Sequence, residues 1–239
     1  MPWLLLFYSL SNGLGDPFNE GAIQPFTLSP GAIQVSAIDG VRLGLDGGRE
    51  LITGGVSSLV SPELMLTQQV VEDGSFALAV SGGAGFPTPG LRLAQGLWFP
   101  GDVEIPPAIV GAGGLSVALS SQAYTVAAAV HARKALVGGG VLSVMDHAWL
   151  DPYLAPLTEG WAVSTRLRLS WLPLSGGWEV LADGVAQWPA GPDLNGRLLA
   201  YRGVSEHWAL GLGVAGAMES HTYGVDGHLA PLLDFKGQF

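Results

Sequence analysis

The segment 161–171 alternates strictly between two kinds of side chain, and this feature constrains the fold more than any other. Val163 and Leu167 belong to the apolar set, which has a tryptophan at each end, whereas Arg166 and Arg168 belong to the polar set. Such alternation has the period of a β-strand whose two faces meet different environments. Soluble strands usually span about five or six residues. This longer strand therefore fits the apolar band, about 25 Å tall, of a transmembrane β-barrel.

The segment 178–188 repeats this design after a short turn at 174–177. Tryptophan again stands at both ends of one face, while Glu179 and Asp183 lie on the other face. Aromatic residues at the ends of membrane-spanning elements form girdles at the two interfaces with water. We therefore predict a membrane girdle made of Trp161, Trp171, Trp178 and Trp188.

A membrane-spanning helix is the main rival interpretation, and the segment 108–132 is its best candidate. The stretch carries no charge and is long enough to cross a bilayer as a helix. However, Ser120, Ser121 and Gln122 would then lie at the bilayer centre. These polar residues fit better in a turn that joins two strands. The sequence predicts a hairpin here.

Weaker alternation and turn residues extend the pattern along the chain. Alternating segments occur at 33–37, 75–80, 115–120, 124–131 and 208–218, and turns are predicted at 39–40, 46–48, 73–74, 175–177 and 191–193. We predict an all-β fold: a closed antiparallel transmembrane barrel of about 10–12 strands, with an even number expected for a bacterial single-chain barrel. Many inward positions are Ala, Gly or Ser, which predicts a narrow, largely filled lumen.

Composition supports a membrane environment and excludes several functions. Only 13% of the residues are charged, about half the usual share, and the mean hydropathy is +0.37. The net charge of −10 argues against a nucleic-acid partner. The absence of cysteine excludes disulfides and thiolate sites.

Four charged side chains form the candidate site. Arg166, Arg168, Glu179 and Asp183 would point into the same lumen from two adjacent strands. They could form a charged constriction that selects permeants. Alternatively, they form an interior salt-bridge cluster that plugs the barrel, with the charges buried because they are paired. We favour the plug, because a small barrel has little room for water.

The C-terminal segment alternates as well and ends in an aromatic residue. Leu233, Phe235 and Phe239 share one face, and Asp234 and Lys236 share the other. This arrangement resembles the terminal strand of Gram-negative outer-membrane barrels. The resemblance implies that Leu233, Phe235 and Phe239 form the signal read by the barrel-insertion machinery, and that the strand closes the barrel against the first strand. Closure would satisfy backbone groups that are costly to expose to hydrocarbon.

A looser likeness covers more of the chain. The segments 86–93 and 100–106 and the Pro-Leu-Leu-Asp sequence at 231–234 are similar to those of a group of uncharacterised outer-membrane barrels. The likeness implies the fold and an outer-membrane location, but no activity.

The N-terminal segment 1–20 has an apolar core like that of a secretory signal. No Lys or Arg precedes this core and no cleavage site is evident. We interpret residues 1–20 as a truncated signal or an N-terminal segment that packs on the protein, and residues 21–239 as one barrel domain.

No catalytic, cofactor-binding or metal site is predicted. The five histidines form no zinc-binding pair, and no Gly-x-Ser-x-Gly nucleophile motif is present. Asp146 and His147, like Glu206 and His207, are sequence neighbours, but strand neighbours point to opposite faces. We therefore do not expect an enzyme.

The sequence leaves four functional hypotheses. The first is an outer-membrane barrel with a structural, anchoring or envelope-assembly role. The second is a narrow, porin-like passive channel, the third a lipid-modifying enzyme, and the fourth an unusually apolar soluble β-sandwich. The expected partners are outer-membrane lipid, the insertion machinery and other envelope proteins.

Overall fold

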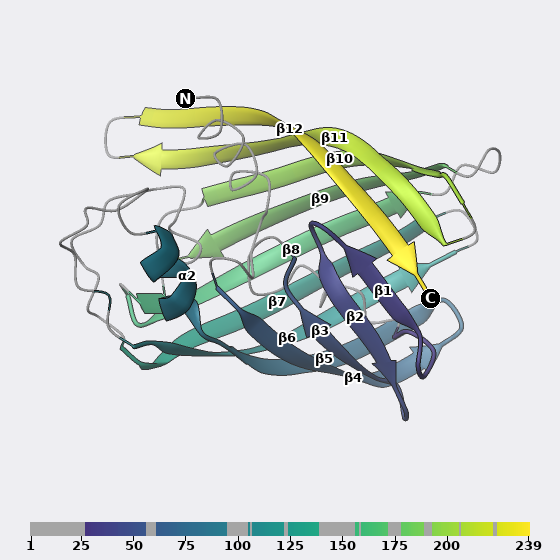
Figure 1. Ribbon diagram of the computed structural model, residues 1–239, viewed down its shortest axis with the longest axis horizontal. Helices are drawn as coiled ribbons and strands as arrows, with labels where there is room; N and C mark the ends of the chain where they lie inside the picture. The colour runs from purple at the N-terminus through teal and green to yellow at the C-terminus, as the bar shows by residue number, and fades with distance from the viewer. Residues whose placement is uncertain are drawn as a thin grey trace.

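The computed structural model describes residues 27–55, 61–94, 105, 107–121, 124–138, 156–157, 159–171, 178–188, 193–205, 207–221 and 224–239. Within these residues the chain forms one closed antiparallel barrel of twelve strands with a short helix (Figure 1). The strands are β1 (Ile33–Ser36), β2 (Gly40–Leu45), β3 (Arg49–Thr53), β4 (Glu63–Asp73), β5 (Phe76–Gly85), β6 (Ile109–Ser120), β7 (Tyr124–Val137), β8 (Trp161–Trp171), β9 (Trp178–Trp188), β10 (Asp193–Gly203), β11 (Trp208–His221) and β12 (Gly224–Gln238). The helix is α2 (Pro87–Ala94).

Each strand pairs with its neighbour in the sequence, and β12 pairs with β1 to close the barrel. Gln34 lies opposite Gln238, and the backbone groups of Ile33 and Phe239 exchange two hydrogen bonds of 2.9 Å. The predictions of an antiparallel barrel, of an even strand number within 10–12, and of closure by the last strand are confirmed.

The uncharged stretch that rivalled the barrel interpretation forms β6 and β7, which pair as a hairpin along most of their length. Ser120 ends β6 and Ser121 begins the connection to β7, as predicted, whereas Gln122 lies outside the described residues. In the described part of the chain, no helix combines the length and the apolar character needed to cross a membrane.

The two faces of β8 differ as the alternation predicts. Leu167 and Leu169 point outward and are 59% and 43% exposed, whereas Ala162 and Ser164 are buried. Polar side chains also lie inside the barrel on other strands, including Arg42, Glu50 and Asp234. Apolar side chains therefore cover much of the outer wall, and the inside is mixed.

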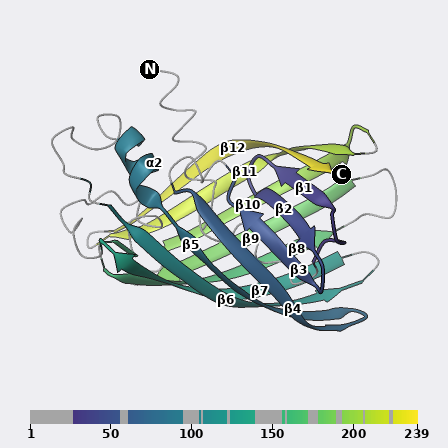
Figure 2. The same ribbon diagram turned by 60° about the horizontal axis from the view of Figure 1, so that its bottom comes forward.

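The helix α2 was not predicted. It lies in the connection between β5 and β6, at the end of the barrel away from the C terminus (Figure 2). Thr88 Oγ1 accepts a 2.7 Å hydrogen bond from the Ala108 backbone N–H, and Arg92 donates to the Ile105 carbonyl at 3.2 Å. The proline-rich sequence suggests irregular structure, but a proline is well tolerated in the first turn of a helix because that N–H has no helical partner.

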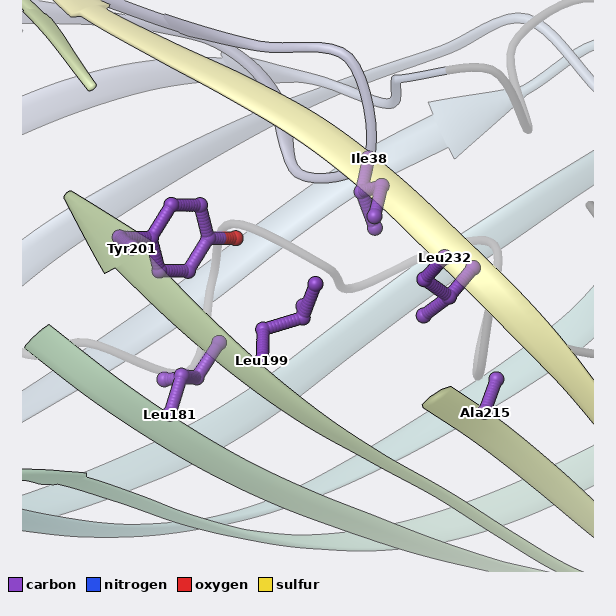
Figure 3. Packing of buried hydrophobic residues seen from close by; sticks show 6 residues of the cluster. All are labelled: Ile38, Leu181, Leu199, Tyr201, Ala215 and Leu232. Carbon is purple, nitrogen blue, oxygen red and sulfur yellow. The ribbon is translucent and has the colours of Figure 1, made fainter. Parts of the chain in front are cut away.

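The connection between β1 and β2 folds inward. Ile38 is 1% exposed and belongs to an apolar cluster inside the barrel with Leu181, Leu199, Tyr201, Ala215 and Leu232 (Figure 3). Gly40 completes the turn with a φ of 84°. A Cβ at Gly40 would lie 2.0 Å from the Thr53 carbonyl oxygen, so the close approach also requires glycine.

Three sequence predictions fall wholly or mostly on other parts of the chain. The possible signal segment 1–20 and the turn at 175–177 lie outside the described residues, and of the turn at 191–193 only Asp193 is described, as the first residue of β10. The predicted turns at 39–40, 46–48 and 73–74 do connect consecutive strands.

Candidate functional site

A row of charged side chains crosses three neighbouring strands inside the barrel. Arg168 on β8 lies directly opposite Asp183 on β9, which lies directly opposite Arg197 on β10. Because side chains alternate along a strand, Arg166 on β8 also faces inward. All four residues are less than 8% exposed.

Asp183 is the centre of this ion-pair cluster. Its two carboxylate oxygens accept hydrogen bonds from Arg166, through Nε at 2.8 Å and through Nη2. Arg168 Nη2 donates to Asp183 at 3.1 Å, and Arg197 donates through Nε at 3.0 Å. Three guanidinium groups thus share one buried carboxylate, which compensates part of the cost of burying charge.

The second carboxylate of the cluster comes from the connection between β1 and β2. Asp39 Oδ1 accepts hydrogen bonds from Arg168 Nη2 at 3.1 Å and from Arg197 Nη2. Burial alone would raise the pKa of the Asp39 carboxyl, but the guanidinium groups of Arg168 and Arg197 outweigh burial and hold this pKa well below its ordinary value. The Asp39 carboxylate is therefore ionised at neutral pH.

Asp234 on β12 holds this connection in place. It accepts hydrogen bonds from the Ser36 hydroxyl at 2.9 Å, the Tyr201 hydroxyl at 2.7 Å and the Ile38 backbone N–H at 3.1 Å. Asp234 itself is fully buried. The backbone of the connection is thus fixed independently of the Asp39 carboxylate.

Glu179 lies apart from the ion-pair cluster. Its carboxylate accepts a 2.8 Å hydrogen bond from Ser170 Oγ and forms a 3.2 Å ion pair with Lys236 Nζ. Lys236 also lies over the Tyr201 ring, 3.9 Å from its centroid. The structure therefore brings together three of the four predicted lumen residues and places Glu179 in a neighbouring, more exposed contact.

Sequence reasoning missed Asp39 and Arg197. The signal for Arg197 is its parity with Asn195, opposite to that of the outward Leu194 and Leu198, but the inward Leu199 interrupts a clean apolar–polar alternation. Asp39 stands in an Asp-Gly turn, where an aspartate needs no functional explanation. Only the inward fold of the connection brings Asp39 to the two arginines.

The space beside the ion-pair cluster is small. A cavity of about 20 Å³ is lined by Asp39, Arg42, Arg168 and Lys236, together with Gln34, Ser36 and Gly40. Such a volume holds about one water molecule. A second ion pair, Arg42 to Glu50 at 2.8 Å, lies on the inner faces of β2 and β3. At this level the charged side chains pack against each other.

The predicted girdle residues lie at strand ends. Trp161 and Trp171 are each 49% exposed at the two ends of β8, and Trp188 is 41% exposed at the end of β9. The Trp178 side chain lies outside the described atoms. Tyr124, opposite Trp171 on β7, adds an exposed aromatic residue at the same end.

A shallow depression of about 1010 Å³ crosses the outer wall between these aromatic ends. Gly184, Gly196 and Gly216 lie side by side on β9, β10 and β11 and form part of its floor. Exposed apolar side chains, Leu194 and Met218 among them, flank the glycines. The depression therefore belongs to the apolar outer surface.

The three residues predicted to form the C-terminal signal also face outward. Leu233, Phe235 and Phe239 are 59%, 47% and 55% exposed. The Trp208 ring lies 6.1 Å from the Phe235 ring and 5.3 Å from the Phe239 ring, measured between centroids. The aromatic end of β12 is thereby packed against the start of β11.

The described residues contain no group of three or more His, Asp or Glu side chains placed to hold a metal ion. His131 is buried on the inner face of β7, and His207 lies against the Phe239 ring at 5.8 Å. The Asp146–His147 pair and Glu206 fall outside the described residues.

The fold and its ion-paired interior define a closed, twelve-stranded antiparallel β-barrel. No protein-family model matches the chain, and no curated protein sequence matches it either.

Proposed function

We propose that the chain is an integral β-barrel of a Gram-negative outer membrane, with a structural or anchoring role in the envelope. The observation that carries the proposal is the apolar outer wall. Leu115, Val130, Leu167, Leu198 and Leu212 project from β6, β7, β8, β10 and β11, and each is at least 50% exposed. Soluble monomers rarely expose contiguous apolar patches of more than a few hundred Å², whereas a lipid-facing wall requires this surface.

The aromatic residues also support a membrane-spanning barrel whose strands cross the bilayer. Trp161 and Trp171 stand at opposite ends of β8 and bracket its exposed leucines. Indole rings at these heights suit the two interfaces of a bilayer, where one side of the ring is apolar and the N–H reaches water. In this proposal, Phe239 and its outward neighbours act as the signal for the insertion machinery.

The filled interior favours anchoring over transport. Ion-paired side chains from β8, β9, β10 and the β1–β2 connection meet inside the barrel, and the cavity beside them has room for about one water molecule. A passive channel needs a continuous water path. A narrow channel is the second candidate. It is favoured by the convergence of Arg166, Arg168 and Arg197 on the lumen, because these positive charges would select anions.

Reconstitution of the purified chain tests the proposal. The chain should fold in detergent micelles and vesicles, resist extraction from vesicles by carbonate, and migrate on gels at a position that changes on heating. In planar bilayers the anchoring role predicts no unitary conductance, and the channel predicts steps that change on Arg166→Ala. A lipid-hydrolysis assay should show no activity. A monodisperse folded chain in plain buffer would contradict the membrane assignment.

A further inference from the structure

The Asp39 carboxylate occupies a site built by the barrel wall. Its Oδ1 lies 3.1 Å from Arg168 Nη2 and 2.5 Å from Arg197 Nη2. The Arg168 and Arg197 side chains are 5% and 3% exposed and come from β8 and β10, whereas Asp39 arrives on a turn. The wall therefore supplies the donors, and the turn supplies the anion.

The two arginines are held in place without Asp39. Asp183 lies directly between them on β9 and accepts hydrogen bonds from Arg168 at 3.1 Å and from Arg197 at 3.0 Å. Because Asp183 and the strand backbones fix both guanidinium groups, removal of the Asp39 carboxylate should leave the donors in position. Such preorganised donors bind an anion with little further cost in side-chain entropy.

The turn that carries Asp39 has its own support. Ser36 Oγ and the Ile38 N–H both donate to Asp234, and Ile38 packs in the interior apolar cluster. Truncating Asp39 therefore removes a carboxylate and not the turn. The 20 Å³ cavity beside it, lined also by Arg42, Arg168 and Lys236, would grow by the volume of the lost carboxylate.

We propose that Arg168 and Arg197 form an anion-binding site inside the barrel, which takes a small carboxylate and is occupied in this structure by the Asp39 side chain. Both guanidinium groups donate charge-assisted hydrogen bonds to one carboxylate oxygen, Asp39 Oδ1, and such bonds are stronger than those between neutral groups. The site also excludes most water, which strengthens the attraction between the charges. Asp39 thus acts as a built-in occupant, and an external carboxylate can take its place where the Asp39 side chain is truncated.

Chemical rescue tests this site. The probe is sodium formate, the smallest carboxylate, and the readout is the thermal unfolding midpoint of Asp39→Ala in detergent micelles. Formate should raise the midpoint by about 2–4 °C over sodium chloride of equal ionic strength. Wild type, whose site is filled, and Asp46→Ala, which removes an exposed carboxylate from the β2–β3 turn, should respond equally to the two salts.

The double variant Asp39→Ala/Arg197→Gln should lose the formate response, since one of the two donors is gone. Asp39→Ser provides a second vacant site if Asp39→Ala folds poorly, with refolding yield in formate against chloride as the readout. The proposal would be overturned if Asp39→Ala and Asp39→Ser both responded equally to formate and chloride, or if formate raised neither the unfolding midpoint nor the refolding yield of either variant. The formate assay tests only the interior of the barrel, so a negative result would not affect the proposal that the chain spans a membrane. Folding in plain buffer would contradict the membrane proposal and would not affect the anion-binding site.

Discussion

Asp39 and Arg197 stand 158 residues apart in the sequence and form an ion pair inside the barrel. This contact joins the inward connection between β1 and β2 to β10 across the lumen. The contact is made by side chains and is separate from the backbone pairing of the strands, so it acts on what fills the barrel.

Substitution of Asp39 by asparagine should reduce the free energy of unfolding by about 3 kcal/mol, because a buried ion pair loses one partner. Asp46→Asn, in the exposed turn between β2 and β3, is the matched control and should change stability by less than about 0.5 kcal/mol. Because the folded-state pKa of Asp39 lies below its ordinary value, its contribution is present above about pH 4 and declines as the pH falls further. Urea unfolding in micelles at pH 7 and pH 3 measures both effects. Equal losses in the two variants would contradict a role for the ion pair.

The two acidic residues of β9 should differ sharply in importance. Asp183 is buried among three arginines, whereas the Glu179 and Lys236 side chains are 26% and 16% exposed. Asp183→Asn should cost about 3–5 kcal/mol or prevent folding, and Glu179→Gln should cost about 1 kcal/mol or less. Folding yield and urea midpoints of the two variants give the comparison. A larger loss for Glu179→Gln would show that the ion-pair cluster is assigned to the wrong carboxylate.

Gly40 is required both by its positive φ and by the lack of space for a Cβ, and a comparison with Gly31 distinguishes the two effects. Both residues have positive φ, 84° and 81°, but a Cβ at Gly31 would have no atom within 4 Å, whereas one at Gly40 would overlap the Thr53 carbonyl. Gly31→Ala should cost about 1 kcal/mol from backbone strain. Gly40→Ala should cost clearly more and loosen the turn that carries Asp39. Similar unfolding midpoints for the two variants would argue against the close approach.

A positive charge on the outer wall should be costly at mid-strand and tolerated near the rim. Leu167, at the middle of β8, and Leu136, near the end of β7, are both exposed. In lipid vesicles, Leu167→Arg should reduce the free energy of unfolding by about 2–4 kcal/mol and Leu136→Arg by about 0–1 kcal/mol. Urea titrations of vesicle-inserted protein measure the difference. Equal and small costs would indicate that water, not lipid, surrounds the wall.

The terminal aromatic residue should matter more for assembly than for stability. Phe239 is exposed and contacts the Trp208 ring. Phe239→Ser should slow insertion by the barrel-insertion machinery several-fold while changing spontaneous folding into detergent only slightly. Insertion assays with and without the machinery separate the two. Leu229→Ser, an exposed residue of the same face of β12 away from the end, is the control and should not slow insertion.

Strand periodicity predicted the wall of the barrel better than its interior. The alternation in 161–171 and 178–188 places Arg166, Arg168 and Asp183 on the faces opposite the tryptophans, and all three are buried, because a period of two determines which face a residue occupies. It does not determine which inward side chains meet. Glu179 shares a face with Asp183 but lies near the end of β9, where Lys236 from β12 is its partner. Contacts of this kind depend on register and barrel closure, which local pattern does not encode.

The other features that the sequence did not predict lie where the chain departs from regular alternation. Asp39 reaches the arginines because its connection folds into the lumen, and α2 forms in a segment rich in proline. Turn residues predict that the chain reverses direction there, but the direction in which a turn packs depends on partners far away in the sequence.

The central claim is that the outward face of the strands meets lipid. The chain lacks cysteine, so single cysteines can carry spin labels at consecutive positions of β8 without further changes. In vesicles, labels at Val163 and Thr165 should collide with oxygen, which concentrates in lipid, and labels at Ala162 and Ser164 should collide with neither oxygen nor a water-soluble nickel reagent. Frequent collisions of the outward labels with the nickel reagent, in a folded protein, would contradict the account.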